Sequence, residues 1–196
     1  MHKTLKQIIK DENLSIEIDP KYGTDKGGPK SYIENFYEGK FKNLQEKKIT
    51  LVEIGVRSGA SLCLWKNYFS KKSKIYGIDN LDDKNNHNIP VKKELISGDN
   101  VEYIIGDAYS EDTKNKVVGN IDILIDDGPH TFESHLQLLE KYISKMNKNG
   151  IIVIEDISYD YNKLFEFIPD QYKNTSSVYD FGGYDNRLIE ILLWPK

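Results

Sequence analysis

Acidic residues follow apolar segments in the second half of this chain, at 126–130 (Asp-Asp-Gly-Pro-His) and at 155–156 (Glu-Asp). Several carboxylates in one cleft repel one another unless a cation or a proton lies between them. Oxygen-rich sites with few nitrogen ligands suit Mg²⁺ or a similar hard ion. His130 adds an imidazole, which is a side chain that can act as a general base. These residues indicate a reaction site with a divalent metal and a base; the alternative is that Asp126 and Glu155 cap helices while the others face water.

A turn with two glycines follows an earlier apolar segment, at 53–61 (Glu-Ile-Gly-Val-Arg-Ser-Gly-Ala-Ser). Because glycine has no Cβ, Gly55 and Gly59 let the backbone turn sharply and approach a ligand closely. Their spacing differs from the Gly-x-Gly-x-x-Gly that surrounds a pyrophosphate. Glu53, two residues before the first glycine, suits a ligand with a cationic amino group better than a diphosphate; the alternative is a tight turn with Glu53 in solvent. The predicted cofactor contacts at this turn are Glu53, Gly55, Gly59 and Ser61.

Further acidic residues end the next two apolar segments. Asp79 comes 24 residues after Gly55, where a carboxylate can accept both hydroxyls of a ribose. NAD enzymes place an acidic residue similarly, so Asp79 alone does not decide the cofactor. Asp107 and Ala108 follow the third segment, and an acidic side chain with an adjacent backbone N–H could bind an adenine edge there. Three acidic strand ends together predict a nucleoside cofactor. Asp126 is also predicted to contact this cofactor.

The elements that must position these residues follow a repeating pattern. Helix-like stretches separate several apolar segments, and one of them, 132–146, has apolar residues at helical spacing and a stop at Asn149-Gly150. Continuous β-branched segments are typical of strands covered on both faces of a parallel sheet. This alternation predicts an α/β fold with a doubly wound sheet, in which the strand ends open on one edge. The five predicted strands are 49–54, 74–78, 101–105, 121–125 and 151–154.

The pattern changes after Pro169. Two predicted strands, 176–181 and 187–194, are joined by the short turn 182–186, which predicts an antiparallel hairpin. A parallel sheet that finishes in an antiparallel hairpin is unlike a simple dinucleotide-binding domain. It matches the Rossmann-like, seven-stranded methyltransferase fold.

The motifs at 53–59, 79 and 106–108 resemble the successive motifs of class I S-adenosylmethionine-dependent methyltransferases. The resemblance covers 49–196, which we therefore expect to be the S-adenosylmethionine-binding domain, with 1–48 as a helical and loop segment that covers the active site. The resemblance implies that Glu53 and Gly55 lie near the methionine moiety. It also implies that Asp79 holds the ribose and that Asp107 faces the adenine.

The acidic residues of the second half resemble those of metal-dependent O-methyltransferases that modify deoxysugars on macrolide antibiotics, and of related bacterial saccharide methyltransferases. The resemblance implies that Asp127, Glu155 and Asp156 bind the metal, and that His130 is the base, with Asp127 counted as catalytic too. The segment 22–27 (Tyr-Gly-Thr-Asp-Lys-Gly), followed by Tyr32 and Tyr37, is similar to a segment that folds over the active site in those enzymes. The alternative for that segment is a surface turn with aromatic packing.

The composition and charge of the chain limit the classes of binding partner that we expect. A net charge of −4 and a pI near 5.6 give no general attraction to nucleic acid or to an anionic membrane. The single cysteine, Cys63, excludes an internal disulfide, and we expect it to be a buried small hydrophobe in a cytoplasmic protein. The expected substrate is a small sugar or sugar nucleotide, and a homo-oligomer is left open.

Two other enzyme classes and one non-catalytic reading compete with this hypothesis. A catechol-type O-methyltransferase would use the same metal chemistry on an aromatic diol. An NAD-dependent oxidoreductase is disfavoured by the glycine spacing and the terminal hairpin. A non-catalytic nucleotide-binding module leaves the acidic residues unexplained. The predicted cofactors are therefore S-adenosyl-L-methionine and Mg²⁺ or a similar divalent ion.

Overall fold

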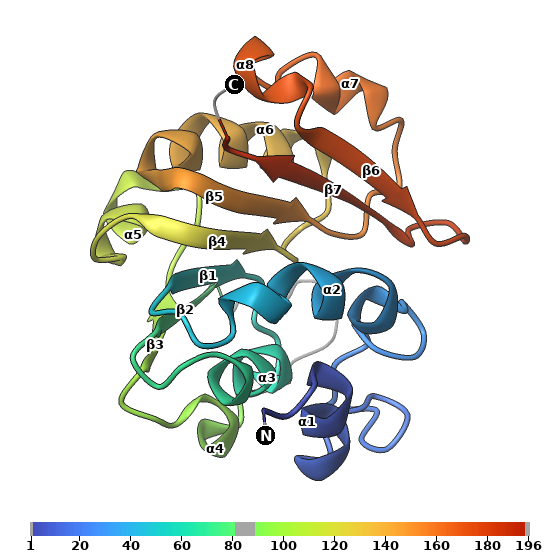
Figure 1. Ribbon diagram of the computed structural model, residues 1–196, viewed down its shortest axis with the longest axis vertical. Helices are drawn as coiled ribbons and strands as arrows, with labels where there is room; N and C mark the ends of the chain where they lie inside the picture. Colours follow the sequence, from blue (N-terminus) through green and yellow to red (C-terminus); the bar gives the residue numbers. More distant parts are fainter. Residues whose placement is uncertain (1, 81–88, 195–196) are drawn as a thin grey trace.

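A seven-stranded sheet forms the centre of the computed structural model, which describes residues 2–80 and 89–194 (Figure 1). The strand order is β3-β2-β1-β4-β5-β7-β6; the first five pair in parallel, and β7 lies antiparallel between β5 and β6. The predicted α/β sheet with its C-terminal hairpin is thereby confirmed. The strands are β1 Thr50–Ile54, β2 Lys74–Asp79, β3 Val101–Ile105, β4 Ile121–Asp126, β5 Met146–Ile154, β6 Ser176–Asp180 and β7 Arg187–Leu192.

Helices cover both faces of the sheet. Side chains alternate along each strand, so that Leu51 packs in one apolar cluster with α3 (Ala60–Tyr68) while Val52 packs in another with α6 (Phe132–Tyr142). Cys63 of α3 is buried, as predicted. The remaining helices are short: α1 Leu5–Asp11, the π-helix Ile33–Tyr37, α2 Glu38–Phe41, the 3₁₀ turns Lys42–Leu44 and Ile143–Lys145, α4 Lys93–Ile96, α5 Glu111–Lys116, α7 Asn162–Phe165 and α8 Asp170–Lys173.

The predicted helix 132–146 is too long. The α-helix ends at Tyr142, a 3₁₀ turn follows, and β5 already begins at Met146, which pairs with Ile121 of β4. Asn149 does not stop a helix; it adopts a positive φ of 69° inside β5, near an irregularity in the pairing with β4. Apolar spacing could not separate the two structures here, because Met146 continues the helical stripe and is also a buried strand residue.

The N-terminal segment, residues 2–48, packs on the α3 face and shares its apolar cluster. Figure 1 shows α1 and α2 beside α3. The rings of Tyr37 and Phe41 lie 5.2 and 5.9 Å from that of Trp65, in edge-to-face geometry. This aromatic contact brings the polar side chains of the segment to the edge of the sheet where β1, β4 and β5 end. No helix within residues 2–80 and 89–194 is both long and apolar enough to cross a membrane.

Candidate active site

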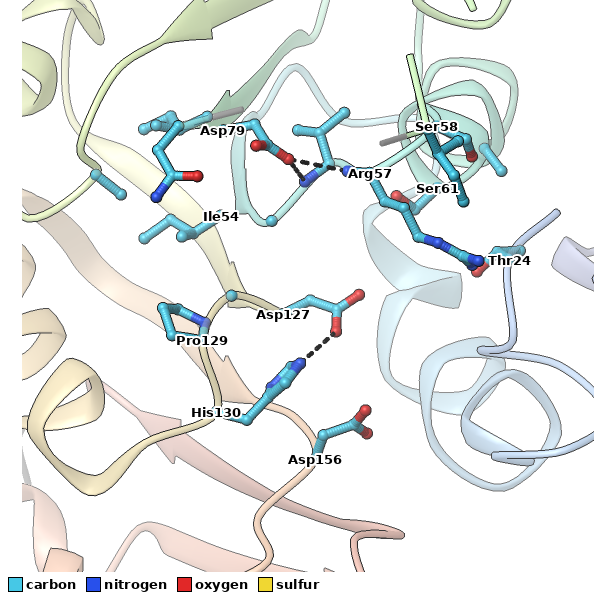
Figure 2. Close-up of a pocket in the computed structure, with 18 of the residues that line it drawn as sticks. Thr24, Ile54, Arg57, Ser58, Ser61, Asp79, Asp127, Pro129, His130 and Asp156 are labelled. Carbon is cyan, nitrogen blue, oxygen red and sulfur yellow. Dashed lines mark hydrogen bonds and ion pairs between the residues drawn. The ribbon is translucent and has the colours of Figure 1, made fainter. Parts of the chain in front are cut away.

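A cavity of about 790 Å³ opens at the carboxyl ends of β1, β2, β3 and β4 (Figure 2). Ligands of open α/β sheets bind at this edge. Eight of the predicted site residues line it: Gly55, Ser61, Asp79, Asp107, Ala108, Asp127, His130 and Asp156. Four others, although described by the structure, are not among the lining residues: Glu53, Gly59, Asp126 and Glu155. The cavity thus joins most of the predicted cofactor contacts to the predicted reaction residues.

The glycine turn after β1 is required by the backbone. Gly55 has a φ of +85°, and a Cβ at this position would lie 1.9 Å from the carbonyl oxygen of Asp127. Gly59 has a φ of +96°, and its Cβ would approach a methyl carbon of Ile96 to 2.7 Å. Both positions therefore exclude other residues. Gly55 allows the β1 turn to pack against the β4 turn, and Gly59 is the N-cap of α3, whose first residues line the cavity.

Asp79, at the end of β2, holds this turn in place. Its Oδ2 accepts hydrogen bonds from the backbone N–H groups of Val56 (2.9 Å) and Arg57 (3.0 Å). Hydrogen bonds to a charged acceptor are stronger than those between neutral groups. The carboxylate predicted to bind a ribose thus also fixes the backbone of the glycine turn, and it lines the cavity in Figure 2.

Asp107 and Ala108 lie on the cavity wall after β3. Asp107 accepts a hydrogen bond from the backbone N–H of Tyr109 at 2.9 Å, and the carbonyl of Ala108 accepts one from the Tyr142 hydroxyl at 2.7 Å. These bonds hold the turn after β3 on the cavity wall.

Glu53 lies behind the wall, fully buried. Its Oε2 accepts a hydrogen bond from the Ser61 hydroxyl at 2.7 Å, and its Oε1 lies 3.4 Å from the ammonium of Lys26. Burial raises the pKa of the Glu53 carboxyl, while Lys26 acts to lower it. The structure therefore connects Glu53 to Ser61 and Lys26, rather than placing it among the lining residues.

Three of the predicted reaction residues lie close together on the cavity wall. One ligand atom each from Asp127, His130 and Asp156 lies within 4.8 Å of the others. His130 Nε2 lies 3.8 Å from Asp127 Oδ1 (Figure 2). His130 and Asp156 have positive φ values of 56° and 55°, a conformation that costs energy in residues other than glycine. The backbone is thus strained at two of the residues that face this part of the cavity.

Glu155 departs from its predicted position. The Lys26 ammonium lies 2.7 Å from its Oε2, and the Tyr37 hydroxyl donates to its Oε1. The carboxylate is 1% exposed and does not belong to the group formed by Asp127, His130 and Asp156. Burial raises the pKa of Glu155 well above its ordinary value, against the effect of Lys26. The predicted ligand set is therefore only partly brought together among the described residues.

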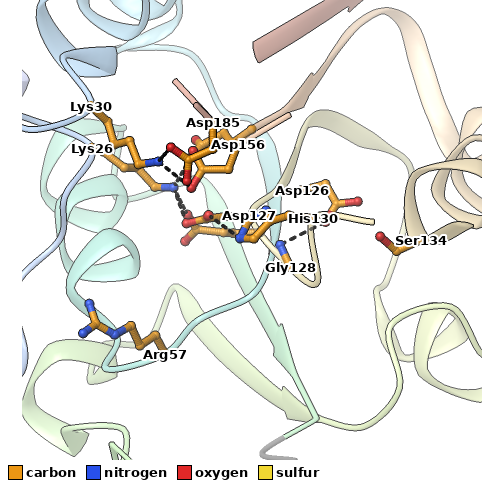
Figure 3. A network of polar contacts seen from close by, with 12 residues as sticks. Lys26, Lys30, Arg57, Asp126, Asp127, Gly128, His130, Ser134, Asp156 and Asp185 are labelled. Atoms are coloured by element: carbon orange, nitrogen blue, oxygen red, sulfur yellow. Dashed lines mark hydrogen bonds and ion pairs between the residues drawn. The ribbon is translucent and has the colours of Figure 1, made fainter. Parts of the chain in front are cut away.

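Asp156 is held by the N-terminal segment. Its Oδ1 accepts from the Tyr32 hydroxyl at 2.7 Å, and its Oδ2 lies 3.2 Å from the Lys30 ammonium, which also contacts Asp185 (Figure 3). Burial, followed by the neighbouring Asp127, raises the pKa of Asp156. The predicted covering segment thus contacts the reaction residues directly.

Asp126 is buried beneath the cavity. Its Oδ1 accepts the backbone N–H of Gly128 at 3.1 Å, and the Tyr109 hydroxyl lies 3.4 Å from both of its oxygens. Burial raises the pKa of Asp126 to about 7. Asp126, the last residue of β4, thus fixes the turn that follows this strand, and it is not among the residues that line the cavity.

Comparison with known families decides the class of protein. A family model described as "Methyltransferase domain" matches residues 52–157, which include the glycine turn and the cluster of Asp127, His130 and Asp156. This chain belongs to that family. It is a class I, S-adenosylmethionine-dependent methyltransferase, as its motifs predicted.

Sugar O-methyltransferases are among the curated relatives of this methyltransferase. It is 29% identical, over 87% of its length, to the 8-demethyl-8-alpha-L-rhamnosyl tetracenomycin-C 2'-O-methyltransferase of Streptomyces olivaceus. It is also 29% identical, over 72% of its length, to the mycinamicin VI 2''-O-methyltransferase of Micromonospora griseorubida. The chain spans 43% and 35% of these two relatives, less than half of each.

Solved structures agree on the fold. The MycE methyltransferase of the mycinamycin pathway, in complex with Mg, S-adenosylhomocysteine (SAH) and mycinamycin VI, superposes with a TM-score of 0.71 at 18% identity, covering 99% of this chain and 54% of MycE. An O-methyltransferase from Bacillus cereus in complex with SAH has a TM-score of 0.65 at 14% identity, covering 98% and 91%. Because both sequence identities are low, these two comparisons support a shared fold only.

The role of Lys26 in this methyltransferase was not predicted from the sequence. The residue lies inside the segment 22–27 that was predicted to fold over the site. The signal that could have identified it is a lysine in a segment expected to cover several acidic residues. Its partners Asp127 and Glu155 are 101 and 129 residues away in the chain. The contact therefore depends on how the N-terminal segment packs on the sheet, which local patterns do not report.

Proposed function

We propose that this methyltransferase transfers a methyl group from S-adenosylmethionine to a hydroxyl of a sugar or glycan precursor. The observation that carries the proposal is the continuity of the cavity. Asp79 and Asp107 line one part of it, Asp127, His130 and Asp156 line another, and the turn at Gly55 packs against Asp127 between them. A cofactor and an acceptor bound at the two ends would meet inside one cavity. The names of the curated relatives support a sugar hydroxyl as the acceptor.

The cofactor end fits S-adenosylmethionine. The cavity has the volume of a site for a drug-sized ligand. In this proposal Asp79 holds the ribose hydroxyls, Asp107 and the backbone near Ala108 contact the adenine, and the turn at Gly55 lies against the methionine moiety. Glu53 supports this turn from behind through Ser61. Bound S-adenosylmethionine would supply an already activated methyl group, so positioning accounts for much of the acceleration.

The reaction end fits a divalent ion on the chemistry of its donors. Asp127 and Asp156 offer carboxylate oxygens, and His130 offers an imidazole nitrogen, within 4.8 Å of one another. Hard ions such as Mg²⁺ prefer oxygen ligands. We therefore assign Asp127 and Asp156 as the protein ligands, with Glu155 behind them. When bound, the ion would lower the pKa of an acceptor hydroxyl and orient it.

His130 removes the acceptor proton in this proposal. Its side chain lines the cavity, and its Nε2 faces Asp127 Oδ1. A neutral imidazole accepts the proton as the oxygen attacks the methyl group. Asp127 orients the ring and stabilises the imidazolium that forms. Residues 2–48 cover the acceptor end in this proposal: Thr24 and Asp25 line the same cavity, and Tyr32 and Lys30 contact Asp156.

Methyl transfer to defined acceptors tests the proposal. The purified protein is incubated with methyl-labelled S-adenosylmethionine and either rhamnosyl and deoxysugar glycosides or a catechol, with Mg²⁺ or with EDTA. We expect label on the glycosides, loss of transfer in EDTA, and recovery with Mg²⁺ or Mn²⁺. Transfer to catechol but not to glycosides would favour the aromatic diol acceptor. Full transfer in excess chelator would refute the proposed requirement for a divalent metal ion.

A further inference from the structure

Lys26 places a buried positive charge among the carboxylates behind the reaction site. The side chain is 1% exposed. Its ammonium lies 2.6 Å from Asp127 Oδ2, 2.7 Å from Glu155 Oε2 and 3.4 Å from Glu53 Oε1. Figure 3 shows Lys26 pointing from the N-terminal segment toward Asp127. One side chain from outside the sheet thus contacts acidic residues at the ends of β1, β4 and β5.

The ammonium of this lysine is surrounded by the carboxylates of Asp127, Glu155 and Glu53. A buried charge is tolerated when it is paired and hydrogen-bonded. Lys26 therefore places a positive charge among carboxylates that would otherwise repel one another.

The two carboxylate oxygens of Asp127 have different neighbours. Oδ2 binds Lys26, and Oδ1 lies 3.8 Å from His130 Nε2. The Asp127 carboxylate thus lies between Lys26 and His130. Both oxygens of Glu155 are occupied, by Lys26 and by Tyr37, so Glu155 anchors the lysine from the opposite side.

We propose that Lys26 is a positioning residue for methyl transfer, which holds Asp127 so that its second oxygen faces His130 and the acceptor. This inference rests on the proposed function. It makes the N-terminal segment a part of the active site rather than a cover alone. A misplacement of about 1 Å can reduce turnover about 10²-fold, so the loss of this contact should appear in kcat.

Three variants separate positioning from general packing. Lys26→Met keeps the length of the side chain and removes the charge. Lys40→Met is the matched control: Lys40 is also in the N-terminal segment, and its ammonium lies 2.7 Å from Glu190 Oε2, a buried carboxylate of β7 outside the cavity lining. Lys26→Arg keeps the charge. For each we measure kcat, KM for the acceptor, SAH affinity by calorimetry and unfolding by urea.

We expect Lys26→Met to lower kcat about 10²-fold, with SAH affinity unchanged and with Lys26→Arg recovering part of kcat. Lys40→Met should lower stability and leave kcat near that of the parent. If Lys26→Met does not fold, a double variant that combines Lys26→Met with Glu155→Gln removes one charge of each sign. The kcat of this double variant is compared with that of Glu155→Gln alone, and it should be lower by the same factor.

The outcomes distinguish the two proposals. A parent inactive toward every acceptor overturns the proposed function and this role of Lys26 with it. An active parent with unchanged kcat in Lys26→Met, or with the pair no slower than Glu155→Gln, overturns the positioning role alone. An equal loss of kcat in Lys40→Met also overturns it, because docking of the segment would then explain the effect.

Discussion

Neighbouring residues at a strand end serve different purposes in this methyltransferase. Asp126 is buried beneath the cavity whereas Asp127 lines it, and Glu155 is buried against Lys26 whereas Asp156 lines it. Each acidic pair therefore contributes one residue to the cavity and one behind it. The sequence predicted where these carboxylates gather, and it could not assign their faces, because each strand ends in a turn whose conformation depends on tertiary contacts.

His130 provides the residue-scale prediction. His130→Ala should lower kcat by about 10²–10⁴-fold, the usual contribution of a positioned proton transfer. SAH affinity should change little, because the imidazole lies at the reaction end of the cavity. Steady-state kinetics and calorimetry check both. His2→Ala, which changes an exposed histidine next to Glu46, is the control. A His130→Ala variant with near-normal kcat would show that another group takes the proton.

At the scale of elements, the strands and the hairpin were predictable and the N-terminal segment was predictable only in part. The strands have continuous apolar sequence with acidic ends, which is a local signal. The segment reaches the site through Lys26, Tyr32 and Tyr37, whose partners are more than 100 residues away. The helix 132–146 was predicted too long, since a helical stripe can run on into a buried strand without a change of residue type.

Tyr37 tests how firmly the segment is tied to the sheet. Tyr37→Phe removes the hydroxyl that donates to Glu155 and leaves a buried oxygen without that bond. We expect the free energy of unfolding to fall by about 1–3 kcal/mol, measured by urea denaturation. Tyr184→Phe, at a ring that is 79% exposed, is the control and should change it by less than about 0.5 kcal/mol. Equal unfolding free energies for the two variants would show that the Tyr37 hydroxyl does not help to hold the segment on the sheet.

For the whole molecule, stability should depend on pH through His135 of α6. This histidine is buried, its Nδ1 lies 2.7 Å from the Tyr159 hydroxyl, and burial lowers its pKa to about 3. Between pH 6.5 and 3 the unfolded chain therefore binds a proton that the folded protein does not. The free energy of unfolding should fall as the pH falls through this range, and the contribution is lost progressively below 6.5.

His135→Asn removes the titrating group and keeps a polar atom near Tyr159. From pH 7.5 to 5, the parent should lose about 2 kcal/mol more of its unfolding free energy than this variant. Urea denaturation at both pH values gives the comparison. Parallel losses in the two proteins would show that His135 does not remain neutral in the folded state.

Binding of SAH tests the central claim most directly, because the cavity joins the glycine turn, Asp79 and Asp107 at one edge of the sheet. Calorimetric titration of the parent should give saturable binding of SAH at one site and no binding of NAD. Asp79→Ala should weaken SAH at least about tenfold, since a hydrogen bond to a charged group contributes about 1.5–3 kcal/mol; Asp99→Ala, at an exposed carboxylate outside the cavity, should not. Tight NAD binding without SAH binding, or equal SAH affinity in the parent and Asp79→Ala, would contradict the account.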